Sequence, residues 1–239
     1  MLAFVIASHG RLGILKQNIK HLLNYGDIFL TVSYEEDDRF IYHNFINEID
    51  DPFPKLHYST GPNNPLGNKW QRCVDMARSV NPSLLITCGS DDFISTDYIE
   101  NAMKILDKGY DFVGANYWYM TDGRSHYKAK YRHRQDFPAG SGRVFTKKCL
   151  DAINWEVFDR KKDRLLDDKA LEQIKKAKIK TYISQEPEKD GLRILAVKGN
   201  WDCLNPMQKF LTSKTVTMER IIILPEQFPT IEINPTCVV

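Results

Sequence analysis

The stretch Leu84-Leu85-Ile86-Thr87-Cys88-Gly89-Ser90-Asp91-Asp92-Phe93 joins an uncharged apolar run to two adjacent carboxylates. Such a run is typical of a strand that is covered on both faces in an α/β sheet. Ligands of these sheets bind at the carboxyl ends of the strands, where two acids can hold a divalent cation and, through it, a diphosphate. The stretch therefore indicates an enzyme that handles a nucleotide-bound group. The alternative is that the acids cap a helix beginning near Ser95, a position where Asp and Ser are common.

The composition is that of an ordinary globular protein. The 239 residues are 42% apolar and 27% charged, and a chain of this length can bury a core without disulfide or metal staples. A net charge of +2 is too small to imply a polyanionic partner by itself. The five cysteines are scattered without a CxxC pair, which predicts reduced thiols and neither a zinc site nor a disulfide framework.

The first residues predict a strand and not a signal peptide. Residues 1–7 are apolar but lack a basic region, and Ser8-His9-Gly10-Arg11 interrupts the run. No apolar stretch approaches the length of about 18 residues that a transmembrane helix needs. We therefore expect a cytoplasmic protein without a transmembrane segment.

Strands and helices alternate through the first half of the chain. Hydrophobic periodicity predicts strands at 2–8, 28–34, 56–58, 84–88 and 110–119, and helices at 12–23, 40–49, 66–80 and 98–106. This alternation favours an α/β fold with a mostly parallel, doubly wound sheet. The second half is less regular: 121–138 is a long loop or edge hairpin, helices are expected at 145–153, 165–177 and 206–211, and strands at 192–197 and 221–224. We expect one domain, 1–239, in which about 1–115 binds the nucleotide and about 116–239 binds the acceptor and completes the site.

The order of these motifs resembles that of GT-A-fold glycosyltransferases, especially family 2, over roughly residues 1–185. The resemblance implies a Rossmann-like three-layer α/β domain with a mostly parallel central sheet. It implies donor-binding roles for Ala7, Ser8, His9, Arg11, Glu35, Asn64, Gly67, Lys69, Ser90 and Asp91. It also implies that Asp92, with Asp91 beside it, binds Mn²⁺ or Mg²⁺, and that Asp168, with Asp167 second, is the catalytic base.

The chemistry of sugar transfer calls for these residue types. A divalent metal stabilises the charge that the departing diphosphate gains, and a carboxylate can take the proton of the attacking hydroxyl, which predicts inversion at the anomeric carbon. Adjacent side chains on a strand point to opposite faces, so the two acids are not both expected to bind the metal directly. The resemblance implies that Asp92 binds the metal and that Asp91 contacts the ribose or sugar. Lys69 suits a phosphate or sugar oxygen, and Gly67 suits a close backbone approach. The simpler alternatives are a solvated lysine for Lys69, a surface charge for Arg11 and a helix N-terminal acid for Asp168.

Three further features have both a functional and a structural interpretation. The segment Arg124–Arg134 interleaves basic and aromatic residues, which suits a nucleic acid or acidic glycan but also the charged face of an edge strand. Gly140-Ser141-Gly142 is either a loop that offers N–H groups to a ligand or a tight turn. The third feature comprises three tryptophans, Trp118, Trp155 and Trp201, which suit sugar stacking but more often belong to a core. In addition, the resemblance implies that Lys198 and the four residues after it lie near the diphosphate.

We therefore predict a metal-dependent glycosyltransferase that uses a nucleoside-diphosphate sugar, UDP-sugar by default, and a glycan or other hydroxyl acceptor. Three alternatives stay open: a glycosyltransferase with a nucleic-acid acceptor, a nucleotidyltransferase, and a non-enzymatic nucleic-acid-binding module. A nucleotidyltransferase usually opens with a Gly-rich loop, and Ser8-His9-Gly10-Arg11 has a single glycine.

Overall fold

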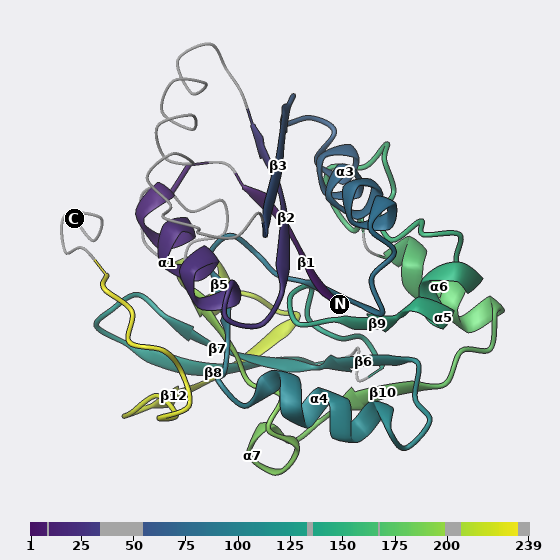
Figure 1. Cartoon of the computed structure of the whole chain (residues 1–239). Helices are drawn as coiled ribbons and strands as arrows, with labels where there is room; N and C mark the ends of the chain where they lie inside the picture. Colours follow the sequence, from purple (N-terminus) through teal and green to yellow (C-terminus); the bar gives the residue numbers. More distant parts are fainter. Residues whose placement is uncertain (9, 34–54, 133–135, 167, 199–206, 234–239) are drawn as a thin grey trace.

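The computed structural model describes residues 1–8, 10–33, 55–132, 136–166, 168–198 and 207–233. Over these residues the chain forms two β-sheets that face a common apolar core, with helices on both faces of the larger sheet (Figure 1). The predicted α/β class with a mostly parallel central sheet is confirmed. Within the described residues, no helix combines the length and the apolar character that crossing a membrane requires.

The larger sheet has seven strands in the order β10-β6-β9-β4-β1-β2-β3. Neighbouring strands are parallel except at β9, which runs antiparallel to both β4 and β6. The strands β1 and β4 lie near the centre, as expected of apolar sequences without charge that are covered on both faces. The strand bounds are β1 (Leu2–Ser8), β2 (Asp27–Ser33), β3 (Leu56–Gly61), β4 (Leu84–Thr87), β6 (Phe112–Ala115), β9 (Val144–Thr146) and β10 (Thr181–Ser184).

Helices cover both faces of this sheet. One face packs against α3 (Leu66–Ser79), α5 (Lys147–Ala152) and α6 (Asp168–Lys176), on the right in Figure 1. The other face packs against α1 (Leu12–Leu22), α4 (Tyr98–Leu106) and the inner face of the smaller sheet. Two short helices, α7 (Pro187–Asp190) and α8 (Met207–Leu211), lie in the C-terminal part.

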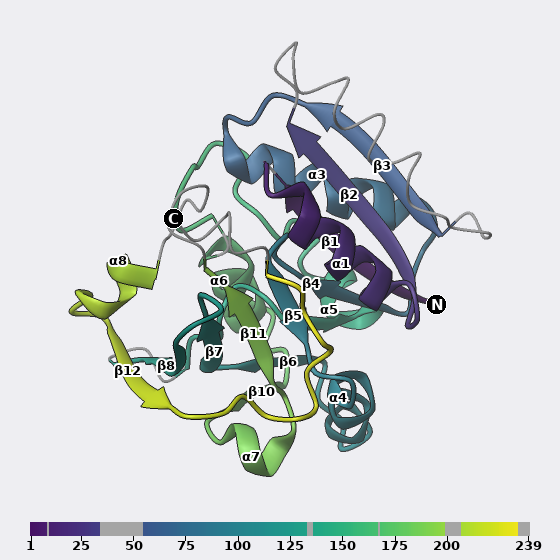
Figure 2. The ribbon, with the colours of Figure 1, turned by 90° about the vertical axis from the view of Figure 1, so that its left-hand side faces the viewer.

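The smaller sheet has five strands in the order β12-β8-β7-β11-β5. Its inner face contributes Trp118, Met120 and Ala129 to the common core. Its outer face carries Tyr119 and Leu195 and is covered by the C-terminal segment 224–233, which crosses in front of β11 in Figure 2. The strand bounds are β5 (Asp92–Ile94), β7 (Tyr117–Thr121), β8 (His126–Tyr131), β11 (Ile194–Val197) and β12 (Val216–Ile221).

The chain passes between the two sheets at turns that are bonded to each other. The turn after β4 leads into β5, and the loop before β9 returns the chain to the larger sheet. The Thr87 hydroxyl donates to the Gly140 carbonyl at 2.7 Å, and the Gly142 N–H donates to the Thr87 carbonyl at 2.7 Å. Arg143, which is buried, donates to the carbonyls of Ala139 and Pro138 at 2.9 Å each. These bonds fix both loops at the carboxyl end of β4.

Several predictions from the sequence are corrected by the topology. The expected strand 110–119 is two strands, β6 and β7, which belong to different sheets. The basic segment does not form an edge strand, because β8 pairs with β7 on one side and β12 on the other. The expected strand 221–224 lies instead at β12, and the short strands β5, β9 and β10 were not predicted. The expected helix 40–49 falls outside the described residues.

A substitution at Gly142 tests the packing of the loop before β9. Gly142 has φ +75°, and a Cβ there would lie 2.5 Å from Ile194 Cδ1 and 2.7 Å from the Tyr98 hydroxyl oxygen. We expect Gly142→Ala to lower the free energy of unfolding by about 2–4 kcal/mol, through backbone strain and overlap. Denaturant titration measures this change.

Gly13→Ala is the matched control, because Gly13 lies in α1 with nothing within 4 Å of its Cβ position. The control should be neutral or gain up to about 1 kcal/mol from helix propensity. Equal behaviour of the two variants would contradict the described packing of Gly142.

Candidate active site at the carboxyl end of the central strand

The acid pair lies at the turn where the chain leaves β4 for β5. The Cys88 N–H donates to the Val5 carbonyl at 3.0 Å, and the Asn18 amide, from α1, donates to the Gly89 carbonyl at 2.9 Å. Gly89 has to be glycine here, because a Cβ would lie 2.2 Å from Asp92 Oδ2. The acids do not cap a helix: Asp97 precedes α4 and accepts a hydrogen bond from Ser95 at 2.6 Å. The capping alternative is therefore wrong.

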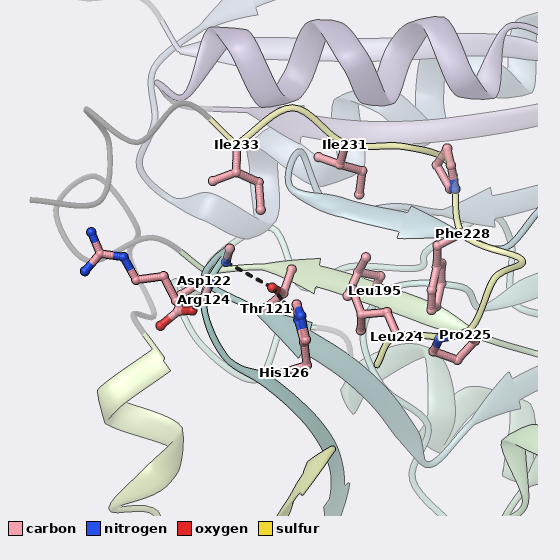
Figure 3. Close-up of a pocket in the computed structure, with 12 residues that line it drawn as sticks. Thr121, Asp122, Arg124, His126, Leu195, Leu224, Pro225, Phe228, Ile231 and Ile233 are labelled. Carbon is pink, nitrogen blue, oxygen red and sulfur yellow. Dashed lines mark hydrogen bonds between the residues drawn. The ribbon is translucent and has the colours of Figure 1, made fainter. Parts of the chain in front are cut away.

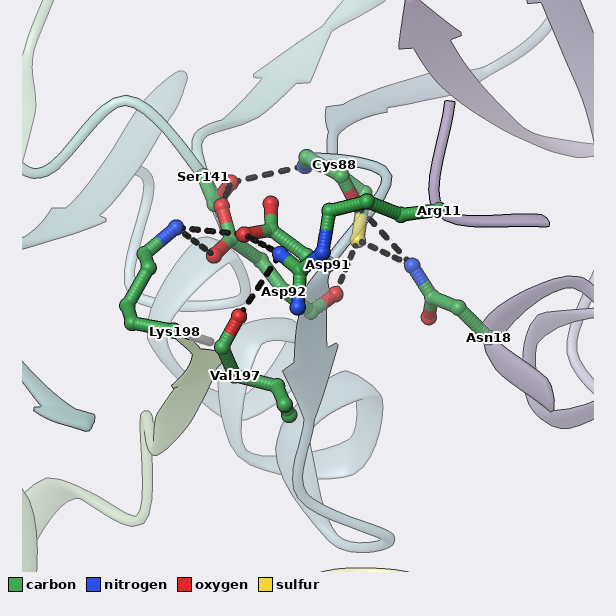
Figure 4. A network of polar contacts seen from close by, with 9 residues as sticks. Arg11, Asn18, Cys88, Asp91, Asp92, Ser141, Val197 and Lys198 are labelled. Carbon is green, nitrogen blue, oxygen red and sulfur yellow. Dashed lines mark hydrogen bonds and ion pairs between the residues drawn. The ribbon is translucent and has the colours of Figure 1, made fainter. Parts of the chain in front are cut away.

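Asp91 accepts from two cations that come from distant parts of the chain (Figure 4). Arg11 Nη1 lies 2.6 Å and Lys198 Nζ 2.7 Å from Asp91 Oδ2. Arg11 Nη1 also donates to the Val197 carbonyl at 2.8 Å. The Asp91 and Val197 backbones are themselves bonded, N–H of Val197 to the Asp91 carbonyl, at 2.8 Å. Arg11 is therefore part of a built site and not a surface charge, since its side chain is 7% exposed.

Asp92 is held by a hydroxyl and shares one of these cations. The Ser141 hydroxyl donates to Asp92 Oδ2 and accepts from the Gly89 N–H at 2.8 Å. Lys198 Nζ lies 3.5 Å from Asp92 Oδ1. The Gly140-Ser141-Gly142 loop thus presents a side chain to the acid pair, while the Gly142 N–H is bonded to β4 and does not face a ligand.

Burial and charge separate the two carboxylates. Burial alone raises the pKa of Asp91, but the Lys198 ammonium and the Arg11 guanidinium outweigh it and hold that pKa below its usual value. Burial also raises the pKa of Asp92; Lys198 opposes this, but the neighbouring charge of Asp91 adds to it, and the pKa stays above its usual value. Asp91 is therefore the firmly ionised member of the pair, and Asp92 is the one that accepts a proton more readily.

The arrangement does not fit a divalent metal held by the two acids. An ion such as Mg²⁺ or Mn²⁺ binds to carboxylates whose charge is not otherwise neutralised. Here Arg11 and Lys198 balance Asp91 and Asp92, and the Lys198 ammonium contacts both carboxylates. Among the described residues, no three His, Cys, Asp or Glu side chains are grouped so that they could hold a metal ion.

Lys69 is buried in α3 among acceptors from other segments of the chain. The residue is 1% exposed, and its ammonium donates to the Ser8 carbonyl, to the Ser33 hydroxyl and, at 3.1 Å, to Asn63 Oδ1. These acceptors engage its three N–H donors. Lys69 therefore joins the ends of β1 and β2 to the loop before α3 and is not a solvated lysine; its contact with a phosphate or sugar stays a prediction.

Gly67 also serves packing within the chain. A Cβ there would lie 1.9 Å from the Asp159 carbonyl oxygen, and the Gly67 N–H donates to the Lys162 carbonyl at 2.8 Å. Gly67 thus allows a close backbone approach to the 159–162 loop, and its role at a donor stays a prediction.

The remaining predicted residues divide by location. Ala7 and Ser8 end β1, and the Ser8 hydroxyl is buried with no hydrogen-bond partner among the described residues. Ser90 lies in the acid turn, Asn64 is exposed in the loop before α3, and Asp168 is the first residue of α6. Asp168 as base stays a prediction. Three predicted site residues, His9, Glu35 and Asp167, fall outside the described residues, as do Trp201 and the residues just after Lys198.

A cavity of about 400 Å³ opens at the ends of β7 and β11, under the C-terminal segment (Figure 3). Leu195 and Phe228 form part of an apolar wall, and Arg124 and His126 belong to a polar rim. Thr121 connects the cavity to the acid pair, because its carbonyl accepts from the Lys198 N–H at 2.7 Å. Trp118 and Trp155, by contrast, are 7% and 4% exposed and belong to the core.

Three contributors to the site have no motif of their own in the sequence. Asn18 shares the buried face of α1 with Leu15, Ile19 and Leu22, but a lone asparagine on an apolar face carries no signal of a contact to the acid turn. Ser141 is visible only as the middle of a glycine-flanked loop, and Arg143 resembles any charged residue next to a strand. The bonds of Asn18 and Ser141 join residues 71 and 49 positions apart, whereas the Arg143 side chain donates to carbonyls four and five residues before it.

Comparison with known proteins gives the fold. No protein-family model and no curated protein matches the sequence. Solved structures of S. aureus TarS do match. TarS 1-349 aligns over 82% of this chain and 60% of its own, with a TM-score of 0.55 and 11% identity. TarS 1-349 in complex with UDP-GlcNAc aligns over 88% of this chain and 63% of its own, with a TM-score of 0.51 and 12% identity.

The fold is GT-A-like, as these matches to a GT-A glycosyltransferase show. The chain spans about three fifths of the TarS fragment that it matches. At 11–12% identity the comparison establishes the architecture alone, so the chemistry has to be argued from the side chains of this chain.

Removal of the Lys69 ammonium tests its structural role. We expect Lys69→Met to lower the free energy of unfolding by about 2–4 kcal/mol, because the Ser8 carbonyl and Ser33 hydroxyl lose a buried charged donor. The matched control is Lys104→Met, which removes an exposed pair with Glu100 on α4 and should cost no more than about 0.5 kcal/mol. A loss below about 1 kcal/mol in Lys69→Met, measured by denaturant titration, would contradict the structural role.

Proposed function

We propose that this protein is a glycosyltransferase that moves a sugar from a nucleoside-diphosphate sugar to an acceptor hydroxyl. The observation that carries the proposal is the pair Asp91 and Asp92 at the carboxyl end of β4, set between Arg11 and Lys198 in a GT-A-like fold. In open α/β sheets the carboxyl ends of the strands are where ligands bind. Two nearly buried cations beside two carboxylates suit a ligand that carries both a diphosphate and ribose or sugar hydroxyls.

The donor would lie along the ends of β1, β2 and β4. The Ser8 hydroxyl offers a buried donor to the nucleotide, and Asp91 offers a charged acceptor to a ribose or sugar hydroxyl. We take UDP-sugar as the default donor, because a matched TarS structure contains UDP-GlcNAc. Because Lys198 contacts both carboxylates, we assign no Mn²⁺ or Mg²⁺ to Asp92, in contrast to the expectation from the sequence.

In the proposed transfer, the anomeric carbon exchanges its bond to the diphosphate for a bond to the acceptor. The acceptor oxygen forms a bond to the anomeric carbon while the bond from that carbon to the diphosphate oxygen breaks. The electron pair of the broken bond leaves with the nucleoside diphosphate, and the acceptor proton passes to the carboxylate of the base, Asp168 as the sequence predicts. Attack opposite the leaving group gives inversion.

The acceptor would bind in the cavity under segment 224–233. Thr121 lines this cavity, and its carbonyl accepts from the Lys198 N–H at 2.7 Å. The apolar wall of the cavity includes the ring of Phe228, and an aromatic ring suits the carbon-rich face of a sugar.

Calorimetric titration of UDP, GDP, CMP and dTDP tests the donor site. We expect one nucleotide to bind, and Asp91→Asn to weaken its binding at least tenfold, because a charged acceptor is lost and Arg11 and Lys198 lose their partner. Asp75→Asn is the control, since Asp75 pairs with Arg160 on the surface of α3. Unchanged affinity in Asp91→Asn, in a folded protein, would contradict the donor site.

Asp168→Asn separates the base from the donor site. The variant should keep its affinity for the nucleotide and lose transfer by about a hundredfold or more, because the amide cannot accept the acceptor proton. Sugar transfer in the presence of the donor and a panel of hydroxyl acceptors measures this. A transfer rate near that of the wild type would remove Asp168 from the role of base.

The products distinguish the alternatives. Release of a nucleoside diphosphate with sugar transfer supports the glycosyltransferase, whereas release of pyrophosphate identifies a nucleotidyltransferase. Transfer to DNA or RNA, with binding that weakens steeply as salt rises, identifies a nucleic-acid acceptor. Binding of nucleic acid without turnover identifies a binding module.

A further inference from the structure

Two backbone hydrogen bonds at the end of β11 fix the position of Lys198. Its own N–H donates to the Thr121 carbonyl at 2.7 Å, and the preceding Val197 N–H donates to the Asp91 carbonyl at 2.8 Å. The side chain is 12% exposed, and its ammonium lies 2.7 Å from Asp91 and 3.5 Å from Asp92. The short strand β11 therefore delivers one positive charge to the space between the two carboxylates.

Arg11 supplies the second charge from the start of α1. Its guanidinium is held by Asp91 and by the Val197 carbonyl, and the side chain is 7% exposed. Among the described residues, these two cations and two carboxylates sum to no net charge. A divalent ion entering between Asp91 and Asp92 would have to displace Lys198 and lie close to Arg11. Because the two cations balance the carboxylates, there is no excess negative charge to attract that ion.

We propose that Lys198, together with Arg11, supplies the positive charge that holds and neutralises the diphosphate of the donor, so that donor binding needs no divalent metal. This inference rests on the proposed function. The ammonium keeps its protons throughout: the bond from the anomeric carbon to the diphosphate oxygen breaks, the electron pair stays on that oxygen, and Lys198 stabilises the resulting charge. It thus provides fixed electrostatic stabilisation of the leaving group.

Ser141 explains how Lys198 can turn to a phosphate without leaving Asp92 alone. The Ser141 hydroxyl already donates to Asp92 and is itself held by the Gly89 N–H at 2.8 Å. Asp91 likewise keeps Arg11 when Lys198 moves. Each carboxylate therefore keeps one partner when Lys198 turns to a phosphate: Arg11 for Asp91 and Ser141 for Asp92.

The test compares nucleotide affinity with and without metal in the full chain. The probe is the tightest of UDP, GDP, CMP and dTDP, titrated by calorimetry in EDTA and in buffer with Mn²⁺ or Mg²⁺. We expect wild-type affinity to agree within about twofold across these buffers. Affinity that appears only with Mn²⁺ or Mg²⁺ would overturn the inference while leaving the donor site intact. Absence of nucleotide binding in every buffer would overturn the proposed function and this inference with it.

Variants of Lys198 give a second readout. Lys198→Met should weaken nucleotide binding about tenfold to a hundredfold in EDTA, because a charged hydrogen bond to phosphate is lost. Mn²⁺ should then restore part of the affinity, since Asp91 and Asp92 carry excess negative charge once the ammonium is gone. Lys198→Arg, which keeps the charge, should bind in EDTA within a few-fold of the wild type.

Lys128→Met is the matched control, because Lys128, on β8, pairs with Glu188 of α7 and contacts neither Asp91 nor Asp92. It should bind the nucleotide as the wild type does in every buffer. Wild-type affinity in EDTA for a folded Lys198→Met would overturn the inference. If that variant does not fold, the EDTA comparison on the wild type and Lys198→Arg decides it.

Discussion

The ion pairs of Asp91 hold together three segments that are far apart in the sequence. Arg11 stands between β1 and α1, Asp91 follows β4, and Lys198 follows β11, so one carboxylate joins residues separated by 80 and 107 positions. A buried carboxylate without these cations would be costly, because desolvation alone raises its pKa. The two sheets meet at this point, and the Asp91 carboxylate therefore constrains both the fold and the candidate site.

This constraint explains why the surroundings are so densely hydrogen-bonded. Thr87, Gly140 and Gly142 tie the loop before β9 to the end of β4, and that loop brings Ser141 to Asp92. Glycine at 89 leaves room for the Asp92 carboxylate. The polar groups thus form a network in which each acid has more than one partner, as buried charges require.

The sequence predicts the central sheet well, because β1, β2, β3 and β4 each carry a clear strand pattern and α1, α3 and α4 a clear helical one. It also predicts the acid pair at the end of β4 and a place for Lys198 nearby. The smaller sheet is harder to predict: β5 and β9 have three residues each, and β8 alternates in charge because one face packs on the core, not because it is an edge. Short strands that pair across long sequence separations have no local pattern to reveal them.

The roles of the functional residues are also hard to predict from the sequence. A lysine on a helix, such as Lys69, carries no sequence signal that separates a phosphate contact from a buried structural ammonium, and only its partners Ser8 and Ser33 decide. The same reasoning applies to the metal prediction, because the pair Asp91-Asp92 suits a divalent ion until Arg11 and Lys198 are placed beside it. Charge balance is a property of the folded site and not of the motif.

A crystal structure of the protein with UDP, grown in EDTA, tests the central claim most directly. The account predicts density for the diphosphate within hydrogen-bond distance of Lys198 Nζ and Arg11, at the carboxyl end of β4, with Asp92 still bonded to Ser141. A diphosphate bound elsewhere on the molecule, or bound at Asp92 only when the crystals contain Mn²⁺, would contradict it.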